Sequence, residues 1–231
     1  MHIPDGYLSP ATWGSLYAAM IPVWGMASRW AKKHLKTKQA PYLALGAAFS
    51  FVIMMFNIPI PGGTTGHAAG MVLVAILLGP WAAVLAITVA LAIQALVFGD
   101  GGITALAANC FNIAFAGSFA GYWTYRLIAG KSETTGKRRI TASAVAGYVG
   151  INVSALLTAV ELGIQPLIAV SATGQPLYAP YPLSVAVPVM MGEHLLLFGF
   201  VEAAVTALVV RYIQQTDPKM LASFHLASTR A

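Results

Sequence analysis

Apolar stretches long enough to cross a lipid bilayer constrain this chain more than any other feature. A helix that crosses a bilayer needs about 20 apolar residues, with a range of roughly 17 to 25. We read seven such spans, near 11–30, 41–57, 67–78, 81–98, 104–129, 140–162 and 183–212. The sequence therefore predicts an all-α integral membrane protein.

The composition supports this interpretation. Of the 231 residues, 58% are hydrophobic and 9% are charged, against roughly 25% charged residues in ordinary soluble domains. So few charges could not cover a soluble protein of this size, whereas lipid solvates an apolar exterior. The net charge of +6 would fit nucleic-acid binding in a soluble protein. Here the basic residues fall between apolar spans, so we expect no nucleic-acid partner.

The positions of the basic residues predict the orientation. All 13 Lys and Arg residues lie in three clusters, within 29–38, 126–139 and 211–230. Since cytoplasmic loops are enriched in Lys and Arg, seven crossings with the N-terminus outside place every cluster in the cytoplasm. The third span is short. However, a single crossing over 67–98 would move the second cluster outside, so we expect the third span to cross.

We expect one transmembrane domain over 1–231, with 1–10 as an extracellular segment and 212–231 as a cytoplasmic tail. The N-terminal sequence lacks the basic region and the cleavage site of a signal peptide, so we expect Met1 to be the mature N-terminus. The segment 58–66 is rich in Pro and Gly and predicts an irregular outer loop.

The pair Met1-His2 is a potential metal chelator. The α-amine of Met1, the deprotonated backbone amide of His2 and its imidazole Nδ1 would bind one ion in a single plane. Square-planar nitrogen sites favour Ni(II) or Cu(II). His67 is the best fourth ligand, because it follows an outer loop on the same side as the N-terminus. Its place at an expected helix start counts against the site, since a cation there meets the positive end of the helix dipole.

The remaining histidines and the buried carboxylates fit this site less well. His34 lies in the first basic cluster, His225 in the tail and His194 within the seventh span. Ionisable residues inside a span default to a functional hypothesis, so His194, Glu193 and Glu202 are candidates, with a hydrogen-bonded structural role as the alternative. Glu193 and Glu202 are nine residues apart and should point to opposite helix faces.

Neither enzymatic nor nucleotide-binding motifs are evident. The run Gly130-Lys131-Ser132 resembles the end of a phosphate-binding loop, but Tyr125 stands where that motif requires its first Gly. We expect no nucleotide on this chain and no enzymatic activity. The single Cys110, in an apolar stretch, indicates packing rather than metal binding.

Three motifs resemble those of a known family. They are MHIPDGYLSP at 1–10, GGTTGH at 62–67, and GDGGITAL at 99–106 with Asn109 after it. Together they resemble the substrate-binding membrane subunits (S components) of nickel and cobalt energy-coupling-factor (ECF) transporters, the NikM/CbiM family. The resemblance extends over most of the chain, and the first motif is specific because it is tied to residue 1.

The resemblance implies a seven-helix subunit of an ABC-type importer in a prokaryotic inner membrane. In the family the metal ligands match Met1, His2 and His67, the residues that the chelation argument also selects. Asp5, Asp100 and Asn109 would surround them. The implied partners are a transmembrane coupling subunit, two cytoplasmic ATPase subunits and a small additional membrane subunit.

The motifs look more like the nickel branch, and a planar nitrogen site suits Ni(II), with Co(II) as the alternative cargo. Two readings of other classes stay open: an ion-coupled secondary carrier, and an intramembrane metalloenzyme built on Glu193, His194 and Glu202. We find neither the paired broken helices of the first nor the close His pair of the second. Since the ligands must be unprotonated to bind metal, we expect binding to be lost as the pH falls through roughly 6.

Overall fold

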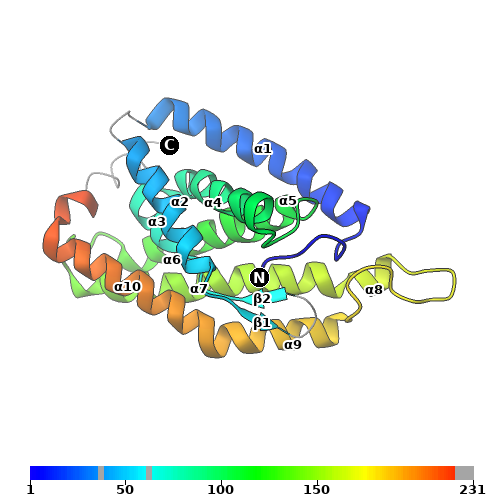
Figure 1. Cartoon of the computed structure of the whole chain (residues 1–231). Coiled ribbons are helices and arrows are strands. Elements are labelled where there is room, and N and C mark those ends of the chain that lie inside the picture. The colour runs from blue at the N-terminus through cyan, green and yellow to red at the C-terminus, as the bar shows by residue number, and fades with distance from the viewer. Residues whose placement is uncertain (36–38, 61–63, 222–231) are drawn as a thin grey trace.

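The structure, a computed structural model, describes residues 1–35, 39–60 and 64–221, and helices make up most of them (Figure 1). The first three helices are α1 (Pro10–His34), α2 (Ala40–Met54) and α3 (Met71–Leu78). A fourth helical stretch joins α4 (Pro80–Ile93) to a π-helical segment, η2 (Gln94–Phe98).

The second half of the chain continues in the same way. A fifth stretch joins α5 (Leu106–Asn109), the π-helical η3 (Cys110–Gly117) and α6 (Ser118–Ala129). Helix α7 (Lys137–Gly163) is followed by the short α8 (Gln165–Ile168). The last stretch joins α9 (Leu183–Glu193), the π-helical η4 (His194–Phe198) and α10 (Gly199–Thr216).

Each expected span overlaps one of these helical stretches. Among the described residues, three stretches are long and apolar enough to cross a membrane by length and composition: Pro80–Phe98, Lys137–Ile168 and Leu183–Thr216. The predicted, predominantly helical architecture is thus confirmed, and it includes helices able to cross a membrane.

Helix α7 is the centre of the packing, and it contacts α6, α9 and α10 (Figure 1). Glycines let its neighbours approach closely. A Cβ atom built on Gly150 of α7 would lie 2.4 Å from Cγ2 of Val72 and 2.8 Å from the carbonyl oxygen of Gly117. Small residues at such crossings are how membrane helices gain dispersion contacts.

The segment 58–66 is not an irregular loop in its described part. Strands β1 (Ile58–Ile60) and β2 (Thr64–Gly66) pair antiparallel, with Ile60 opposite Thr64; the residues between them lie outside the described ranges. Ile60, Thr64 and Gly66 are buried. Because buried backbone groups need hydrogen-bond partners, the paired strands replace the loop that Pro and Gly content suggested.

The third span also differs from its expected form. Residues 67–70 are irregular, and α3 begins only at Met71, after Gly70 with φ of 68°. His67 therefore precedes the helix by four residues. This irregular piece lies inside the protein, where irregular backbone at membrane depth is tolerated.

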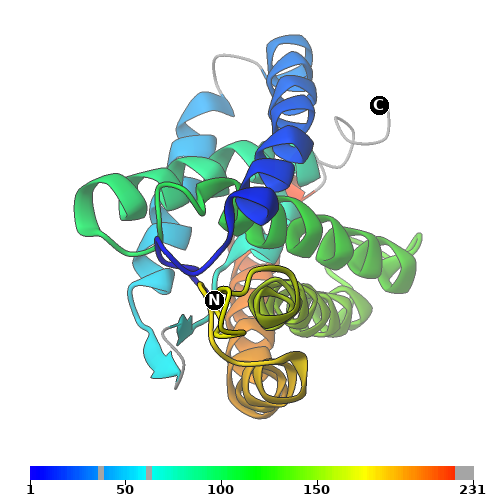
Figure 2. The same ribbon diagram turned by 90° about the vertical axis from the view of Figure 1, so that its right-hand side faces the viewer.

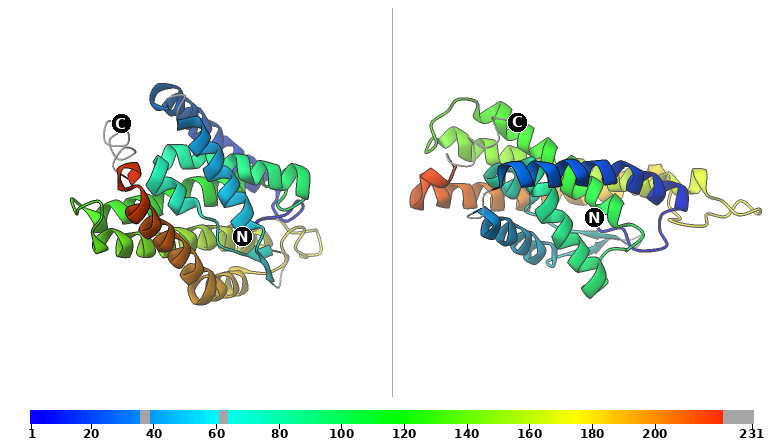
Figure 3. Two further views of the ribbon diagram at one scale, coloured as in Figure 1. Left: turned by 60° about the vertical axis from the view of Figure 1, so that its left-hand side comes forward. Right: turned by 90° about the horizontal axis from the view of Figure 1, so that it is seen from above.

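The N-terminal residues enter the molecule beside the hairpin (Figure 1). Figure 2, which looks onto that end, shows the N-terminus among the surrounding elements rather than at the edge. Met1, His2 and Ile3 are 0%, 3% and 0% exposed. The loop between α8 and α9 reaches beyond the helix ends on the same side (Figure 3), and the N–H of Ala179 in this loop donates to the carbonyl of Tyr7.

The crossing at Gly150 gives a test of the packing. Gly150→Ala should destabilise the protein by about 1–3 kcal/mol, the usual cost of overpacking a close-packed site. Gly25→Ala is the matched control, because a Cβ on this α1 residue would meet no atom within 4 Å and Ala is the better helix former. Thermal unfolding in detergent measures both variants. Equal melting temperatures for the two would contradict the packing described here.

Candidate metal centre

The backbone of Ile3 is held in place by helix α5 and by the loop that precedes it. The side-chain oxygen of Asn109 accepts from the backbone N–H of Ile3 at 2.9 Å, and its amide nitrogen donates to the carbonyl of Ile3 at 3.1 Å. The N–H of Gly102 donates to the same carbonyl at 2.8 Å. Asn109, expected near the ligands, thus fixes the backbone of the N-terminal segment.

Asp5 anchors the same loop from the other direction. Its carboxylate accepts from the N–H groups of Ile103 and Thr104, at 3.1 and 2.8 Å, and from the hydroxyl of Thr104. The fit leaves no room at Gly102, where a Cβ would lie 2.4 Å from the nitrogen of Asp5. The motif around residues 99–106 therefore binds the N-terminal segment through hydrogen bonds and close packing.

The hairpin holds the chelating pair from the opposite side. The hydroxyl of Thr64 donates to the carbonyl of His2 at 2.9 Å. The α-amine of Met1 lies 3.4 Å from the hydroxyl oxygen of Thr65, which accepts from it. Sequence reasoning did not assign these two threonines, although they lie in the GGTTGH motif.

His2 and His67 lie face to face. Their ring centroids are 4.5 Å apart and the rings are inclined by 25°. His67 Nδ1 is 3.1 Å from the carbonyl oxygen of Ala68. Among the described residues, Nε2 of His67 has no hydrogen-bond partner although it is buried. The structure thus brings Met1, His2 and His67 together from two distant parts of the chain.

Asp100 also reaches His2. Its Oδ1 lies 3.1 Å from His2 Nδ1, but the alignment is not that of a hydrogen bond, and both ring nitrogens of His2 are without a hydrogen-bond partner in the described structure. We treat this contact as electrostatic. Asp100 is the expected neighbour that approaches a candidate ligand atom directly.

His194 lies closer to the site than its sequence position suggested. Its side chain is fully buried. Nδ1 lies 2.9 Å from the carbonyl of Met190, and Nε2 has no partner among the described residues. It is near enough to His67 and to the N-terminal amine to interact with both electrostatically. A π-helical turn begins at His194, and α-helical periodicity in the sequence could not predict this turn.

Glu193 and Glu202 do not point to opposite faces. A Cβ on Gly66 would lie 2.5 Å from Oε1 of Glu193, and Glu202 accepts from the N–H groups of Ala69 and Gly70. Both carboxylates thus face the segment that carries His67. The cause is η4, between them, because π-helical turns are wider than α-helical ones and shift the register.

The remaining candidate residues are His34, Cys110 and His225. The ring of His34 stacks on Trp30, with centroids 5.3 Å apart, Cys110 is buried, and His225 lies outside the described residues. Within the described ranges, no three His, Cys, Asp or Glu side chains are close enough together to hold a metal ion. A site here therefore depends on backbone nitrogens as well as on side chains.

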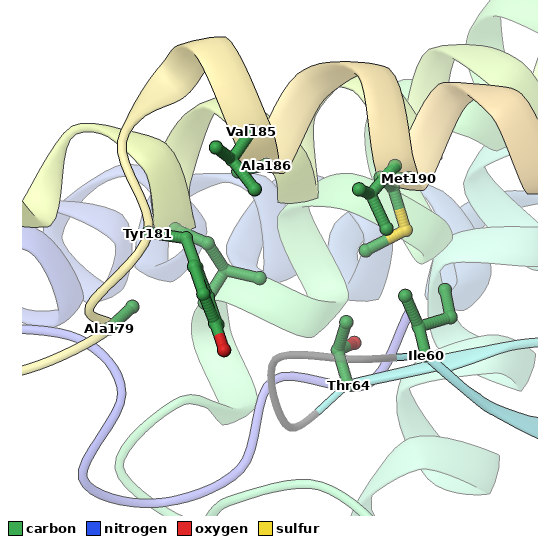
Figure 4. Close-up of a pocket in the computed structure, with 9 residues that line it drawn as sticks. Ile60, Thr64, Ala179, Tyr181, Val185, Ala186 and Met190 are labelled. Carbon is green, nitrogen blue, oxygen red and sulfur yellow. The ribbon is translucent and has the colours of Figure 1, made fainter.

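An apolar cavity of about 120 Å³ lies between the hairpin and α9 (Figure 4). Its lining residues are Ile60, Thr64, Leu162, Ala179, Tyr181, Val185, Ala186, Val189 and Met190. This lining offers neither nitrogen nor carboxylate ligands, so the cavity is a neighbour of the candidate centre and not the centre itself.

Burial changes the acid–base state of the chelating pair. It lowers the pKa of the Met1 amine to about 4, against the opposing charges of Asp100 and Glu193. It also lowers the pKa of His2, against the opposing effect of Asp100. Both groups are therefore unprotonated at neutral pH, which is the form that binds metal.

Comparisons with known proteins give the chain its family. The fold and the buried N-terminal nitrogens define a membrane-type protein with a candidate metal centre. Residues 2–220 match the family model CbiM, the cobalt uptake substrate-specific transmembrane region. The chain belongs to this family.

Two relatives and a solved structure are consistent with this family. The chain is 54% identical over 222 residues to the fused nickel transport protein NikMN of Rhodobacter capsulatus, covering 96% of this chain and 64% of that protein. It is 49% identical over 223 residues to the probable fused nickel transport protein LarMN of Lactiplantibacillus plantarum, covering 96% and 66%. It thus spans about two thirds of the length of these relatives. A crystal structure of a truncated transition metal transporter is 54% identical, with a TM-score of 0.89, over 94% of this chain and 99% of that chain.

The lowered pKa values move the expected loss of metal to more acidic pH than the sequence indicated. A pKa below its ordinary value means that protons compete with the metal only at lower pH. We expect the protein to release Ni(II) at a lower pH than a synthetic peptide of residues 1–6, in which the amine and the imidazole have ordinary pKa values of 8.0 and 6.5. Equilibrium dialysis of both across pH 4–8 checks this, and coincident curves would contradict it.

Proposed function

We propose that this chain is the substrate-specific subunit of an ECF-type ABC importer, and that it captures Ni(II) outside the cell for translocation across the membrane. Co(II) is the alternative cargo. The observation that carries the proposal is the burial, in one place, of Met1, His2 and His67, where both ring nitrogens of His2 and Nε2 of His67 have no hydrogen-bond partner among the described residues. Buried polar atoms without partners are rare in native proteins, and a metal ion would satisfy them.

The ligand set follows from this geometry. The Met1 amine, the His2 amide and His2 Nδ1 would chelate the ion, and Nε2 of His67 would complete the plane. With metal–nitrogen bonds of about 2 Å, two imidazoles on adjacent corners of a square place their ring centroids roughly 4 to 5 Å apart. The observed 4.5 Å lies in this range, but the rings are stacked at 25°, so one ring would have to turn to bring both nitrogens to one ion. The arrangement requires Met1 to keep a free amine, so it requires Met1 to be the first residue of the mature protein.

Nickel is favoured over cobalt on two grounds. Planar four-nitrogen coordination suits Ni(II). The two relatives described above are named nickel transport proteins, although the family model is described as a cobalt uptake region.

The main test is nickel binding by the purified protein. We expect the wild type with an untagged N-terminus to bind one equivalent of Ni(II) with a yellow, low-spin spectrum, and His67→Ala to lose it. His34→Ala is the matched control, because His34 lies at the end of α1 beside Trp30. Isothermal titration and visible absorption measure the three proteins. Nickel bound by His67→Ala as tightly as by the wild type would refute the fourth ligand.

We also propose the topology and the partners. Seven crossings would place the N-terminus and the α8–α9 loop outside, and all the basic clusters in the cytoplasm. In a prokaryotic plasma membrane the chain would act with a transmembrane coupling subunit, two cytoplasmic ATPase subunits and a small additional membrane subunit. The loop between α8 and α9 carries no charged residue, which supports an outer position.

Cysteine labelling in intact cells tests this topology. Thr173, in the loop between α8 and α9, and Thr135, before α7, are both exposed, and the native Cys110 is buried. A membrane-impermeant maleimide should label Thr173→Cys in intact cells and Thr135→Cys only after the cells are permeabilised. Labelling of both variants in intact cells would disprove the orientation.

A further inference from the structure

Glu202 is the buried carboxylate most directly connected to the candidate centre. It lies in the first turn of α10 and is fully buried. Its Oε2 accepts from the backbone N–H groups of Ala69, at 2.8 Å, and Gly70, at 2.9 Å. Burial disfavours a charged carboxyl group, and two N–H donors on one oxygen offset part of that cost.

The first of these hydrogen bonds continues to His67. The N–H of Ala69 and the carbonyl of Ala68 belong to one peptide group, and that carbonyl oxygen lies 3.1 Å from His67 Nδ1. Because a carbonyl oxygen only accepts, Nδ1 must carry the ring proton. Nε2 then has a free lone pair, and it is the buried atom without a partner in the described structure.

We propose that Glu202 is a positioning residue for metal binding, and that it acts on His67 through the peptide group between Ala68 and Ala69. The inference rests on the proposed function, since it assumes that His67 Nε2 binds the ion.

The physical basis is polarisation along the hydrogen-bonded chain. A carboxylate that accepts from Ala69 makes the carbonyl of Ala68 a stronger acceptor, because linked hydrogen bonds strengthen one another. The stronger bond from Nδ1 fixes the ring orientation and raises the basicity of Nε2. Metal-binding histidines commonly donate their second nitrogen to a carboxylate or carbonyl in this way. Here a peptide group stands between the imidazole and the carboxylate.

Glu202 also reduces the electrostatic repulsion between the start of α3 and a cation bound near it. The positive end of that helix repels a metal ion, and the carboxylate accepts from the N–H groups of the two residues that immediately precede the helix. The charge of Glu202 therefore offsets the dipole where His67 enters the site.

The surrounding packing holds both ends of the chain of hydrogen bonds. A Cβ on Gly147 of α7 would lie 2.9 Å from the carbonyl oxygen of Glu202, so α10 is pressed against α7 at this residue. A Cβ on Gly70 would lie 2.7 Å from Phe49 of α2. Segment 68–70 is thus held between α2 and α10, and small displacements of Glu202 would be felt at His67.

The test compares the full-length wild type with Glu202→Gln, using Ni(II) itself as the probe. Gln keeps the shape of the side chain and removes its charge. We expect Glu202→Gln to bind Ni(II) about 10–100-fold more weakly, and its visible absorption band to move to lower energy because Nε2 becomes a weaker donor. A role in fold stability alone would not move the band.

Glu161→Gln is the matched control, since Glu161 is another buried carboxylate whose hydrogen bond runs to Asn112 at 2.8 Å. It should keep the wild-type affinity and band. The proposed action of Glu202 on His67 through the peptide group, called the relay below, is wrong if Glu202→Gln shows the wild-type affinity and band. It is also wrong if Glu161→Gln shows the same losses.

Two further variants, His67→Ala and Glu202→Asp, distinguish failure of the proposed function from failure of the relay. If the wild type binds Ni(II), His67→Ala does not, and Glu202→Gln is unchanged, the proposed function stands and the relay falls. If the wild type binds no Ni(II), or His67→Ala still binds it, both fall. Should Glu202→Gln not fold, Glu202→Asp keeps the charge but withdraws it from Ala69, and it must show the same weaker binding and band shift. Wild-type behaviour of Glu202→Asp would refute the relay.

Discussion

Burial of the first three residues is the constraint on which the rest of the structure depends. A chain terminus is normally loose at the surface, whereas Met1 and Ile3 have no exposed surface at all. Every backbone group taken inside needs a partner. The hairpin, helix α5 and the loop before it supply these partners through Thr64, Asn109 and Gly102, so elements far apart in the sequence are organised around the N-terminus.

The sequence predicted the helical part well, because apolar length alone decides it. It also selected Met1 and His2, since the chelating geometry of an amine and a neighbouring His is local, and His67, since the predicted topology puts it on the same side of the membrane as the N-terminus. The structure places these residues together, and whether they bind metal stays a prediction. The threonines of the hairpin were not selected, because a hydroxyl that holds a backbone carbonyl has no periodic signature.

The errors have a common physical cause. Sequence periodicity assumes α-helical turns, and under that assumption Glu193 and Glu202 diverge. The π-helical segment η4 removes the divergence. Such segments often occur at functional sites, and here η4 begins at His194, beside the candidate centre. Pro and Gly content likewise described 58–66 as a loop, although burial of the backbone favours paired strands.

Charge balance explains why so many carboxylates gather around an otherwise apolar interior. Two imidazoles and an amine are neutral donors, and a deprotonated amide contributes one negative charge, so a bound divalent ion would leave one positive charge inside the protein. A buried charge without a partner is strongly unfavourable. Asp100, at 3.1 Å from His2 Nδ1, is placed to neutralise it. Glu202 is already engaged with the backbone before α3, so under the proposals above the two carboxylates would have separate roles: Asp100 would offset the charge of the ion, and Glu202 would orient the ring of His67.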